Sequence, residues 1–225
     1  MKVSVIIPVG PDDRSHLLPL ALDSYVSQTW PERELIVIDD SPVSHEALVR
    51  RCVPDAVYRH IDPATIGAKR NMACEAATGD VIVHFDSDDW SAPDRIEHQV
   101  NGLLTTGVSL FGYCAAFFWC KRTGKAYRYI GPPNYSIGAA MCYRRTFWQA
   151  NPFPDVSNAE DNHVVFIARN AGVIAASDGF QRIVCRVHDT NVTRSGERVG
   201  NNNWPEVPAD WLPASFFEAE QRCSN

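Results

Sequence analysis

Apolar residues alternate along the first half of the chain between two patterns. Short aliphatic runs such as Val3-Ser4-Val5-Ile6-Ile7 are typical of buried strands. Between these runs, apolar residues recur at helical spacing, which places Ile96, Val100 and Leu103 on one helix face. The pattern predicts strands at 3–7, 34–38, 56–58 and 81–85, and helices near 17–25, 47–52, 67–77 and 96–104. Strands that alternate with helices predict a parallel, doubly wound sheet.

The pattern changes after Gly107. Residues 108–120 favour a strand, and a turn at 122–124 leads into 126–130, which predicts an antiparallel hairpin. Further strands are expected at 137–143 and 183–187, with an amphipathic helix inside 158–171. The segment 190–208 contains Trp204, Arg194 and Arg198 and predicts a long loop, either a lid or a disordered segment. Phe216-Phe217 is expected to anchor a short terminal helix.

Composition bounds the class of protein. The chain has 225 residues, of which 45% are apolar and 21% charged, as in ordinary packed α/β proteins. A net charge of −6 argues against a nucleic-acid partner, because proteins that bind nucleic acid usually carry a basic face. No apolar stretch is long enough to form a transmembrane segment, and no signal peptide precedes the first strand. The seven cysteines contain no Cys-x-x-Cys motif and favour reduced thiols, so we expect a cytoplasmic protein.

The tetrad Asp86-Ser87-Asp88-Asp89 is the most informative polar feature. It follows a buried-looking strand, at the edge where open α/β sheets bind their ligands. Three carboxylates so close together repel, and a divalent cation that also binds a substrate phosphate would relieve the repulsion. The alternative is an acidic turn that caps the next helix, since Asp is common in both settings. The tetrad alone supports both interpretations equally.

Six short motifs in order extend this picture. They are Val3-Ser4-Val5-Ile6-Ile7-Pro8, Leu35-Ile36-Val37-Ile38-Asp39-Asp40-Ser41, Gly67-Ala68-Lys69-Arg70-Asn71 followed by Ala77-Thr78-Gly79-Asp80, the acidic tetrad, Glu160-Asp161 and Arg186-Val187-His188. In this order and spacing the chain resembles the family 2 glycosyltransferases of the GT-A fold.

The resemblance implies a single GT-A domain of the α/β class. Its mostly parallel, Rossmann-like central sheet would carry helices on both faces, beside a small antiparallel second sheet. Residues 1–107 would form the nucleotide-sugar-binding half and residues 108–189 the acceptor-binding half of the same domain. Residues 190–225 would form a flexible loop and a C-terminal helix.

The resemblance also implies how the nucleotide is held. Asp40 would accept hydrogen bonds from a uracil ring, and Pro8 and Val9 would offer backbone contacts to the base. Lys69 and Arg70 fall in the first turn of a helix, where backbone N–H groups favour anions. Arg70 is the expected nucleotide contact, whereas Lys69 is either a second contact or merely solvated.

A Mn²⁺ or Mg²⁺ ion is implied at the tetrad. Asp86 would address the ribose or a metal-bound water, Asp88 would bind the metal directly, and Asp89 would replace or assist Asp88. Ser87, which lies between Asp86 and Asp88, would also contact the nucleotide. His188 is a further candidate ligand, because neutral imidazole commonly binds metals. Its alternative is a hydrogen-bonded histidine at a strand end.

Glu160-Asp161 would carry the chemistry. The implied reaction is inverting transfer of one sugar from a nucleotide-diphosphate sugar, with UDP favoured, to a hydroxyl of a saccharide, lipid-linked or other acceptor. Asp161 would remove the acceptor proton as general base, and Glu160 would hold the acceptor or the helix start. The alternative is that both acids complement a helix N-terminus. No Gln-x-x-Arg-Trp motif is present, so we expect a non-processive enzyme.

Two other functions compete with this one. Sugar nucleotidyltransferases also use a doubly wound sheet and a carboxylate-bound metal, but they usually open with a Gly-rich phosphate loop. This chain reads Pro8-Val9-Gly10-Pro11-Asp12-Asp13 at that point, which ranks this function lower. A non-catalytic nucleotide-sugar-binding protein is the third interpretation.

Overall fold

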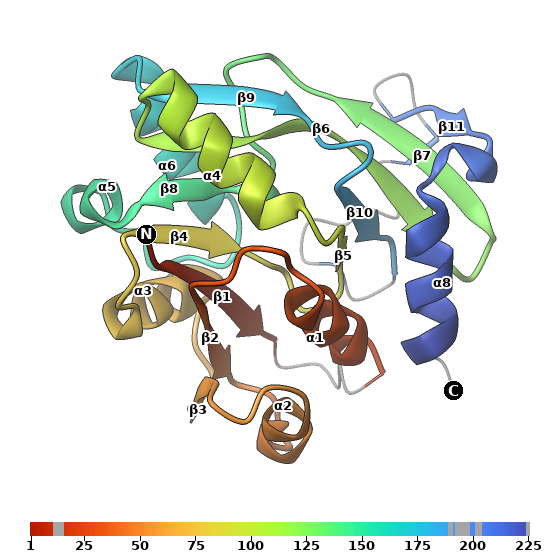
Figure 1. The fold of residues 1–225 in the computed structure, drawn as a ribbon, viewed down its shortest axis with the longest axis horizontal. Helices are drawn as coiled ribbons and strands as arrows, with labels where there is room; N and C mark the ends of the chain where they lie inside the picture. Colours follow the sequence, from red (N-terminus) through yellow and green to blue (C-terminus); the bar gives the residue numbers. More distant parts are fainter. Residues whose placement is uncertain (11–15, 189–190, 192–198, 201–203, 224–225) are drawn as a thin grey trace.

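The chain folds as alternating strands and helices through its first half, as the hydrophobic pattern predicts. The computed structural model describes residues 1–10, 16–188, 191, 199–200 and 204–223 (Figure 1). Arg194, Arg198 and the segment 11–13, which the sequence analysis used, lie outside the described residues. Within the described part of the chain, no helix has the length and hydrophobicity needed to cross a membrane.

The strands of the first half are close to their predicted positions, and the second half adds shorter elements. The strands are β1 (Val3–Val9), β2 (Arg33–Asp39), β3 (Val57–His60), β4 (Val81–His84), β5 (Trp90–Ser91), β6 (Leu110–Cys120), β7 (Lys125–Ile130), β8 (Cys142–Arg144), β9 (Ile174–Asp178), β10 (Ile183–Arg186) and β11 (Glu206–Val207). The helices are α1 (Leu18–Val26), α2 (Glu46–Cys52), α3 (Ile66–Ala76), α4 (Arg95–Thr106), α5 (Arg145–Ala150), α6 (Glu160–Asn170) and α8 (Ala214–Cys223), with short 3₁₀ turns at Gly138–Ala140 and Ala209–Trp211.

All eleven strands among the described residues join one sheet. Its main path runs β11-β7-β6-β8-β4-β1-β2-β3, and β9, β10 and β5 pair beside it. β1 pairs in parallel with both β2 and β4, so the chain reverses its direction of winding next to β1. The predicted hairpin of β6 and β7 is antiparallel, and β8 connects it to β4. The antiparallel strands are thus continuous with the central sheet, and the predicted α/β class is confirmed.

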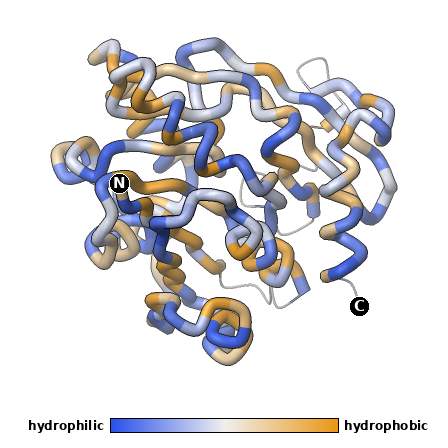
Figure 2. The backbone as a smooth tube through the Cα atoms, in the orientation of Figure 1, coloured by the Kyte–Doolittle hydropathy of each residue, from blue (hydrophilic) through white to orange (hydrophobic). Residues whose placement is uncertain are grey.

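Helices cover both faces of the parallel strands. Alternate β1 residues such as Val5 and Ile7 pack with α1, α2 and α4, whereas Ile6 packs with α3, α5 and α6 on the opposite face. A third apolar cluster places Phe216 of α8 against Trp90 and Val184. Hydrophobic segments therefore gather in the central strands (Figure 2). The parallel strands are apolar nearly throughout because helices cover both faces of the sheet.

The strand predicted at 137–143 is wrong in its first half, which forms the 3₁₀ turn Gly138–Ala140. The carbonyl of Gly138 contacts the imidazole of His84. The carbonyl of Ala139 accepts from Arg95 at 2.6 Å, and that of Ala140 accepts from Gln99 at 2.6 Å. Because side chains from other elements bind these carbonyls, the segment satisfies its backbone without a neighbouring strand.

Candidate active site

A cavity of about 370 Å³ opens at the carboxyl ends of β1 and β4, beside the point where the winding reverses. This is the position at which open α/β sheets bind ligands, and the volume suits a small-molecule site. The cavity is lined by residues from both halves of the chain: Pro8, Gly10, Ala64, Ile66, Lys69, Arg70, Asp86, Ser87, Asp88, Asp89, Phe118, Ile137, Gly138, Ala139, Ser157, Asn158, Ala159, Glu160, Asp161, Cys185, Arg186 and Asn191. Most of the predicted site residues therefore meet in one place.

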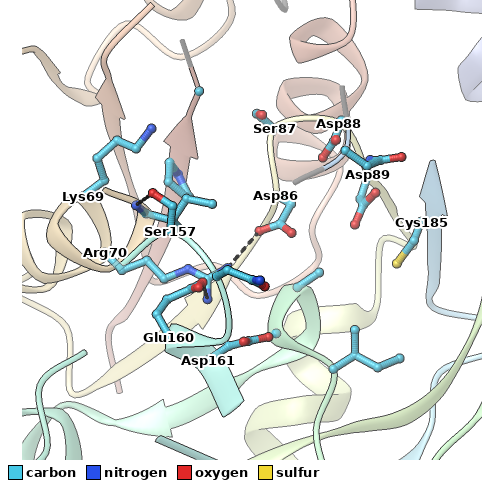
Figure 3. Close-up of a pocket in the computed structure, with 18 of the residues that line it drawn as sticks. Lys69, Arg70, Asp86, Ser87, Asp88, Asp89, Ser157, Glu160, Asp161 and Cys185 are labelled. Atoms are coloured by element: carbon cyan, nitrogen blue, oxygen red, sulfur yellow. Dashed lines mark hydrogen bonds and ion pairs between the residues drawn. The ribbon is translucent and has the colours of Figure 1, made fainter. Parts of the chain in front are cut away.

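The acidic tetrad projects from the end of β4 into this cavity (Figure 3). One oxygen each from Asp86, Asp88 and Asp89 lies within 4.8 Å of the others. Asp88 and Asp89 are buried, and Asp86 is partly exposed. Hard oxygen ligands in this number and spacing suit a divalent cation such as Mg²⁺ or Mn²⁺.

His188, two residues after β10, contacts the tetrad. Its Nε2 lies 2.7 Å from Oδ2 of Asp88, and its backbone N–H donates to the side chain of Asn191 at 2.7 Å. His188 does not line the cavity, so it reaches the site through Asp88. Asn191 lines the cavity and was not predicted from the sequence, because it falls in a segment without periodicity.

Asp89 is buried and is bonded to the strand β10. It accepts one hydrogen bond from the backbone N–H of Arg186 at 2.9 Å and another from the Cys185 thiol. Burial, reinforced by the charges of Asp88 and Asp86, raises the pKa of Asp89 well above its ordinary value. A bound cation would reverse this effect by supplying positive charge between the carboxylates.

Arg70 forms the link between the tetrad and the second half of the chain. Its guanidinium lies 2.9 Å from Glu160 Oε1 and 3.4 Å from Asp86 Oδ1 (Figure 3). It also lies over the Phe153 ring. Burial alone would lower the pKa of Arg70, but Asp86 and Glu160 raise it. The predicted nucleotide contact thus lies in the cavity, paired with two carboxylates.

Glu160 and Asp161 begin α6 and face the cavity from the side opposite the tetrad (Figure 3). Burial raises the pKa of Glu160. The nearby charge of Arg70 opposes this rise, and that of Asp161 adds to it. Ala159, just before the helix, has φ 62, a left-handed conformation that is strained for alanine. A Cβ on Gly138 would lie 2.0 Å from Asp161 Oδ2, so only glycine leaves room for this carboxylate.

Lys69 is buried, which rules out the solvated alternative. Its Nζ donates to Asp40 Oδ1 at 2.7 Å and to the carbonyl of Val9 at 2.8 Å. The other oxygen of Asp40 accepts from the backbone N–H of Ala64 at 3.0 Å. Asp40 and Val9 are not among the described residues that line the cavity, although Pro8 is. The cavity therefore reaches Lys69 rather than the two groups expected to contact a base.

Asn71 provides a contact between distant segments that the sequence did not reveal. Its side chain donates to the carbonyl of Phe153 at 2.8 Å and accepts from the N–H of Phe153 and from the indole of Trp148. Thr65 caps α3 by accepting from the N–H of Ala68, and its hydroxyl donates to Asp155. A Cβ on Gly67 would lie 1.9 Å from the carbonyl of Pro154. Helix α3 and the segment before α6 are thus fixed to each other.

Among known protein families, the sequence profile described as Glycosyl transferase family 2 matches residues 4–168. An uncharacterized glycosyltransferase of Haemophilus influenzae is 33% identical over 107 residues, covering 45% of this chain and 42% of that protein. A poly(ribitol-phosphate) beta-glucosyltransferase of Bacillus spizizenii is 29% identical over 109 residues, covering 45% of this chain and 17% of that protein. The chain thus matches less than half the length of these relatives.

Two solved structures share the fold. Residues 1–349 of S. aureus TarS in complex with UDP superpose with a TM-score of 0.68 at 19% identity, covering 83% of this chain and 61% of that one. The mannosyltransferase PcManGT of Pyrobaculum calidifontis in complex with GDP-Man and Mn²⁺ gives 0.65 at 19% identity, covering 88% and 59%. Because the family profile spans most of the chain, this protein belongs to glycosyltransferase family 2.

Proposed function

We propose that this protein transfers one sugar from a nucleoside-diphosphate sugar to an acceptor hydroxyl, with a divalent cation at Asp86, Asp88 and Asp89. The observation that carries the proposal is the convergence of this triad and Asp161 on one cavity. Family membership favours glycosyl transfer over nucleotidyl transfer. A carboxylate across the cavity from the triad favours catalysis over binding alone.

The triad fits a hard cation in both ligand type and spacing. Asp88 would be the first ligand, held by His188, and Asp86 and Asp89 would complete the carboxylate set. When bound, Mn²⁺ or Mg²⁺ would supply positive charge against a diphosphate leaving group. The mannosyltransferase neighbour was solved with GDP-Man and Mn²⁺, which supports this assignment.

Asp161 would act as the general base. It lies at the first turn of α6, and its Oδ2 packs closely against Gly138. An acceptor hydroxyl beside Asp161 would lose its proton to this carboxylate as it attacks the anomeric carbon. Attack from the side opposite the leaving group would invert the anomeric configuration. Glu160 would hold the helix start through Arg70.

The two halves of the cavity would divide the substrates. Residues before 108 would hold the donor, and Phe118, Ile137 and Gly138 would border the acceptor. A UDP-sugar is the favoured donor, because TarS was solved with UDP and with UDP-GlcNAc. One transfer per encounter is proposed from the absence of a processivity motif.

Calorimetric titration with UDP-, GDP- and dTDP-sugars, each with Mn²⁺ and with chelator, tests the donor and the metal. We expect one donor to bind much more tightly with Mn²⁺ than with chelator, and Asp88→Ala to lose that metal-dependent gain. Asp161→Asn should keep donor binding and lose transfer to an alcohol acceptor by at least about 100-fold. Absence of binding by every donor would overturn the proposal, and normal turnover by Asp161→Asn would remove Asp161 as the base.

A further inference from the structure

Lys69 connects the carboxyl ends of two neighbouring strands. Val9 ends β1, and Asp40 directly follows β2, which pairs with β1 in parallel. The Lys69 ammonium donates to the Val9 carbonyl at 2.8 Å and to the Asp40 carboxylate at 2.7 Å, and its side chain is only 1% exposed. A buried ammonium of this kind is held in one place, unlike a lysine on a surface.

Apolar residues of the cavity lie near Lys69 and its partners. Pro8 precedes Val9, Ala64 donates to Asp40, and Ile66 lies three residues before Lys69 on α3, and all three line the cavity. Asp161 faces the cavity from a different side (Figure 3). In the close-up, Lys69 and Cys185 lie on opposite sides of Asp86 (Figure 3).

The proposed function fixes the direction of the donor, and the next step rests on it. The diphosphate must lie at the triad, and the anomeric carbon must face Asp161. The nucleoside must then extend from the triad toward the remaining part of the cavity, which includes Lys69 (Figure 3). The base would therefore meet Lys69, behind which Asp40 lies.

We propose that Lys69 is the residue that determines which base the donor carries. An ammonium is a donor and never an acceptor. It would favour a ring with a carbonyl oxygen at this edge, such as O4 of uracil, and disfavour a ring with an amino group there, such as cytosine. Without Lys69, the Asp40 carboxylate would be left to accept from an amino group.

UDP and CDP form a matched pair of probes. They have the same shape and differ at the ring edge, where uracil presents a carbonyl and an N–H while cytosine presents an amino group and a bare nitrogen. Binding of each by calorimetry in Mn²⁺ gives a UDP-to-CDP affinity ratio. We expect wild-type protein to prefer UDP by at least about tenfold, and Lys69→Gln to bring the ratio to within about threefold.

Two further variants make the test decisive. Lys69→Gln leaves Asp40 as a buried charge without its cation, so Asp40→Asn combined with Lys69→Gln removes both charges and should show the same loss of preference. Lys125→Gln is the matched control, because Lys125 also pairs with a carboxylate at 2.7 Å but does so outside the cavity. Its ratio should equal that of wild type.

The outcomes separate this inference from the proposed function. If wild type binds UDP with Mn²⁺ and both Lys69 variants keep the wild-type ratio, the role of Lys69 is overturned while the transferase function stands. If wild type binds CDP as well as it binds UDP, the role of Lys69 is also overturned. If wild type binds neither nucleotide, the inference falls, and the proposed function falls with it only if the GDP- and dTDP-sugars also fail to bind.

Discussion

Arg70 and Glu160 form an enclosed ion pair, with 2.9 Å between Nη1 and Oε1, that joins the helix α3 to the first residue of α6. Both side chains are nearly buried, at 5% and 6% exposure. Removing one partner leaves the other charge in the interior, which is far more costly than loss of a surface pair. The pair therefore makes the position of Asp161 depend on α3, which lines the same cavity.

A double-mutant cycle on Arg70→Gln and Glu160→Gln should show a coupling energy of about 1–3 kcal/mol in the free energy of unfolding. Urea unfolding of the four proteins measures it. The exposed pair of Arg50 and Glu46 has a similar distance of 2.7 Å and serves as the control, with an expected coupling of about 0.5 kcal/mol or less. Equal coupling in the two cycles would contradict a buried role for the Arg70 pair.

Gly138→Ala should displace Asp161, because the new Cβ would fall 2.0 Å from its Oδ2. We expect kcat to fall by at least about tenfold while donor binding is kept, since a small misplacement of a catalytic group is costly. Steady-state kinetics and donor titration separate the two effects. Gly124→Ala, in the β6–β7 turn at φ 66, should lose stability and keep kcat. An unchanged kcat in Gly138→Ala would argue against Asp161 as the base.

Ala159→Gly should raise the free energy of unfolding by about 0.5–1 kcal/mol, because glycine adopts the left-handed conformation without the strain that alanine suffers there. Thermal unfolding measures this change. Ala168→Gly, in the buried interior of the same helix, should do the opposite, since glycine weakens helix interiors. A loss of stability in both variants would show that residue 159 is not strained.

His188→Ala should weaken UDP binding by about 10-fold in Mn²⁺ and leave it unchanged in chelator, because His188 holds Asp88 at 2.7 Å. Titration under both conditions measures the difference. His163 is an exposed histidine on α6 and serves as the control, with no change expected in either condition. Equal weakening in Mn²⁺ and chelator would make His188 a purely structural residue.

Glu34 predicts a pH dependence of stability. Burial alone would raise its pKa, but hydrogen bonds from Lys2, Ser4 and Thr78 lower it from 4.5 to about 2. A carboxyl group with a depressed folded-state pKa stabilises the protein above its unfolded pKa and loses that effect as pH falls. Glu34→Gln should therefore lower the melting temperature at pH 7, and the difference from wild type should shrink between pH 4.5 and about 2.

The control for this prediction is Glu75→Gln, on the exposed side of α3. Its melting temperature should follow that of wild type across the same range. A Glu34→Gln difference that stays constant from pH 7 to pH 2 would show that the carboxylate charge contributes nothing.

The acidic tetrad was predictable because its residues are adjacent in the chain and follow an apolar strand. The same holds for Glu160-Asp161 at a helix start. Their meeting across one cavity depends on β8, which inserts antiparallel beside β4. Periodicity does not encode such a pairing, because a three-residue strand gives almost no alternation of apolar and polar positions.

Contacts between distant segments could not be predicted from the sequence. Lys69 reads as a first-turn helix residue, and only the ends of β1 and β2 explain its burial. From the sequence, Gly138 could be a turn or strand glycine. In the structure, the carboxylate of Asp161, 23 positions later, occupies the space that a Cβ on residue 138 would need. The carbonyls of 138–140 find side-chain partners on other elements, which is why a strand pattern there gave a 3₁₀ turn.

The contact between Asn71 and Phe153 limits how family members can be recombined. A chimera joined near residue 107 would take α3 from one parent and the segment before α6 from the other. In this chain the Pro154 carbonyl lies too close to position 67 for any side chain there, and Asn71 makes two hydrogen bonds with the Phe153 backbone. In the chimera, Gly67 and Asn71 would instead face the backbone of the other parent. The residues after 107 can therefore be exchanged between family members only together with α3, so that both sides of this contact come from one parent.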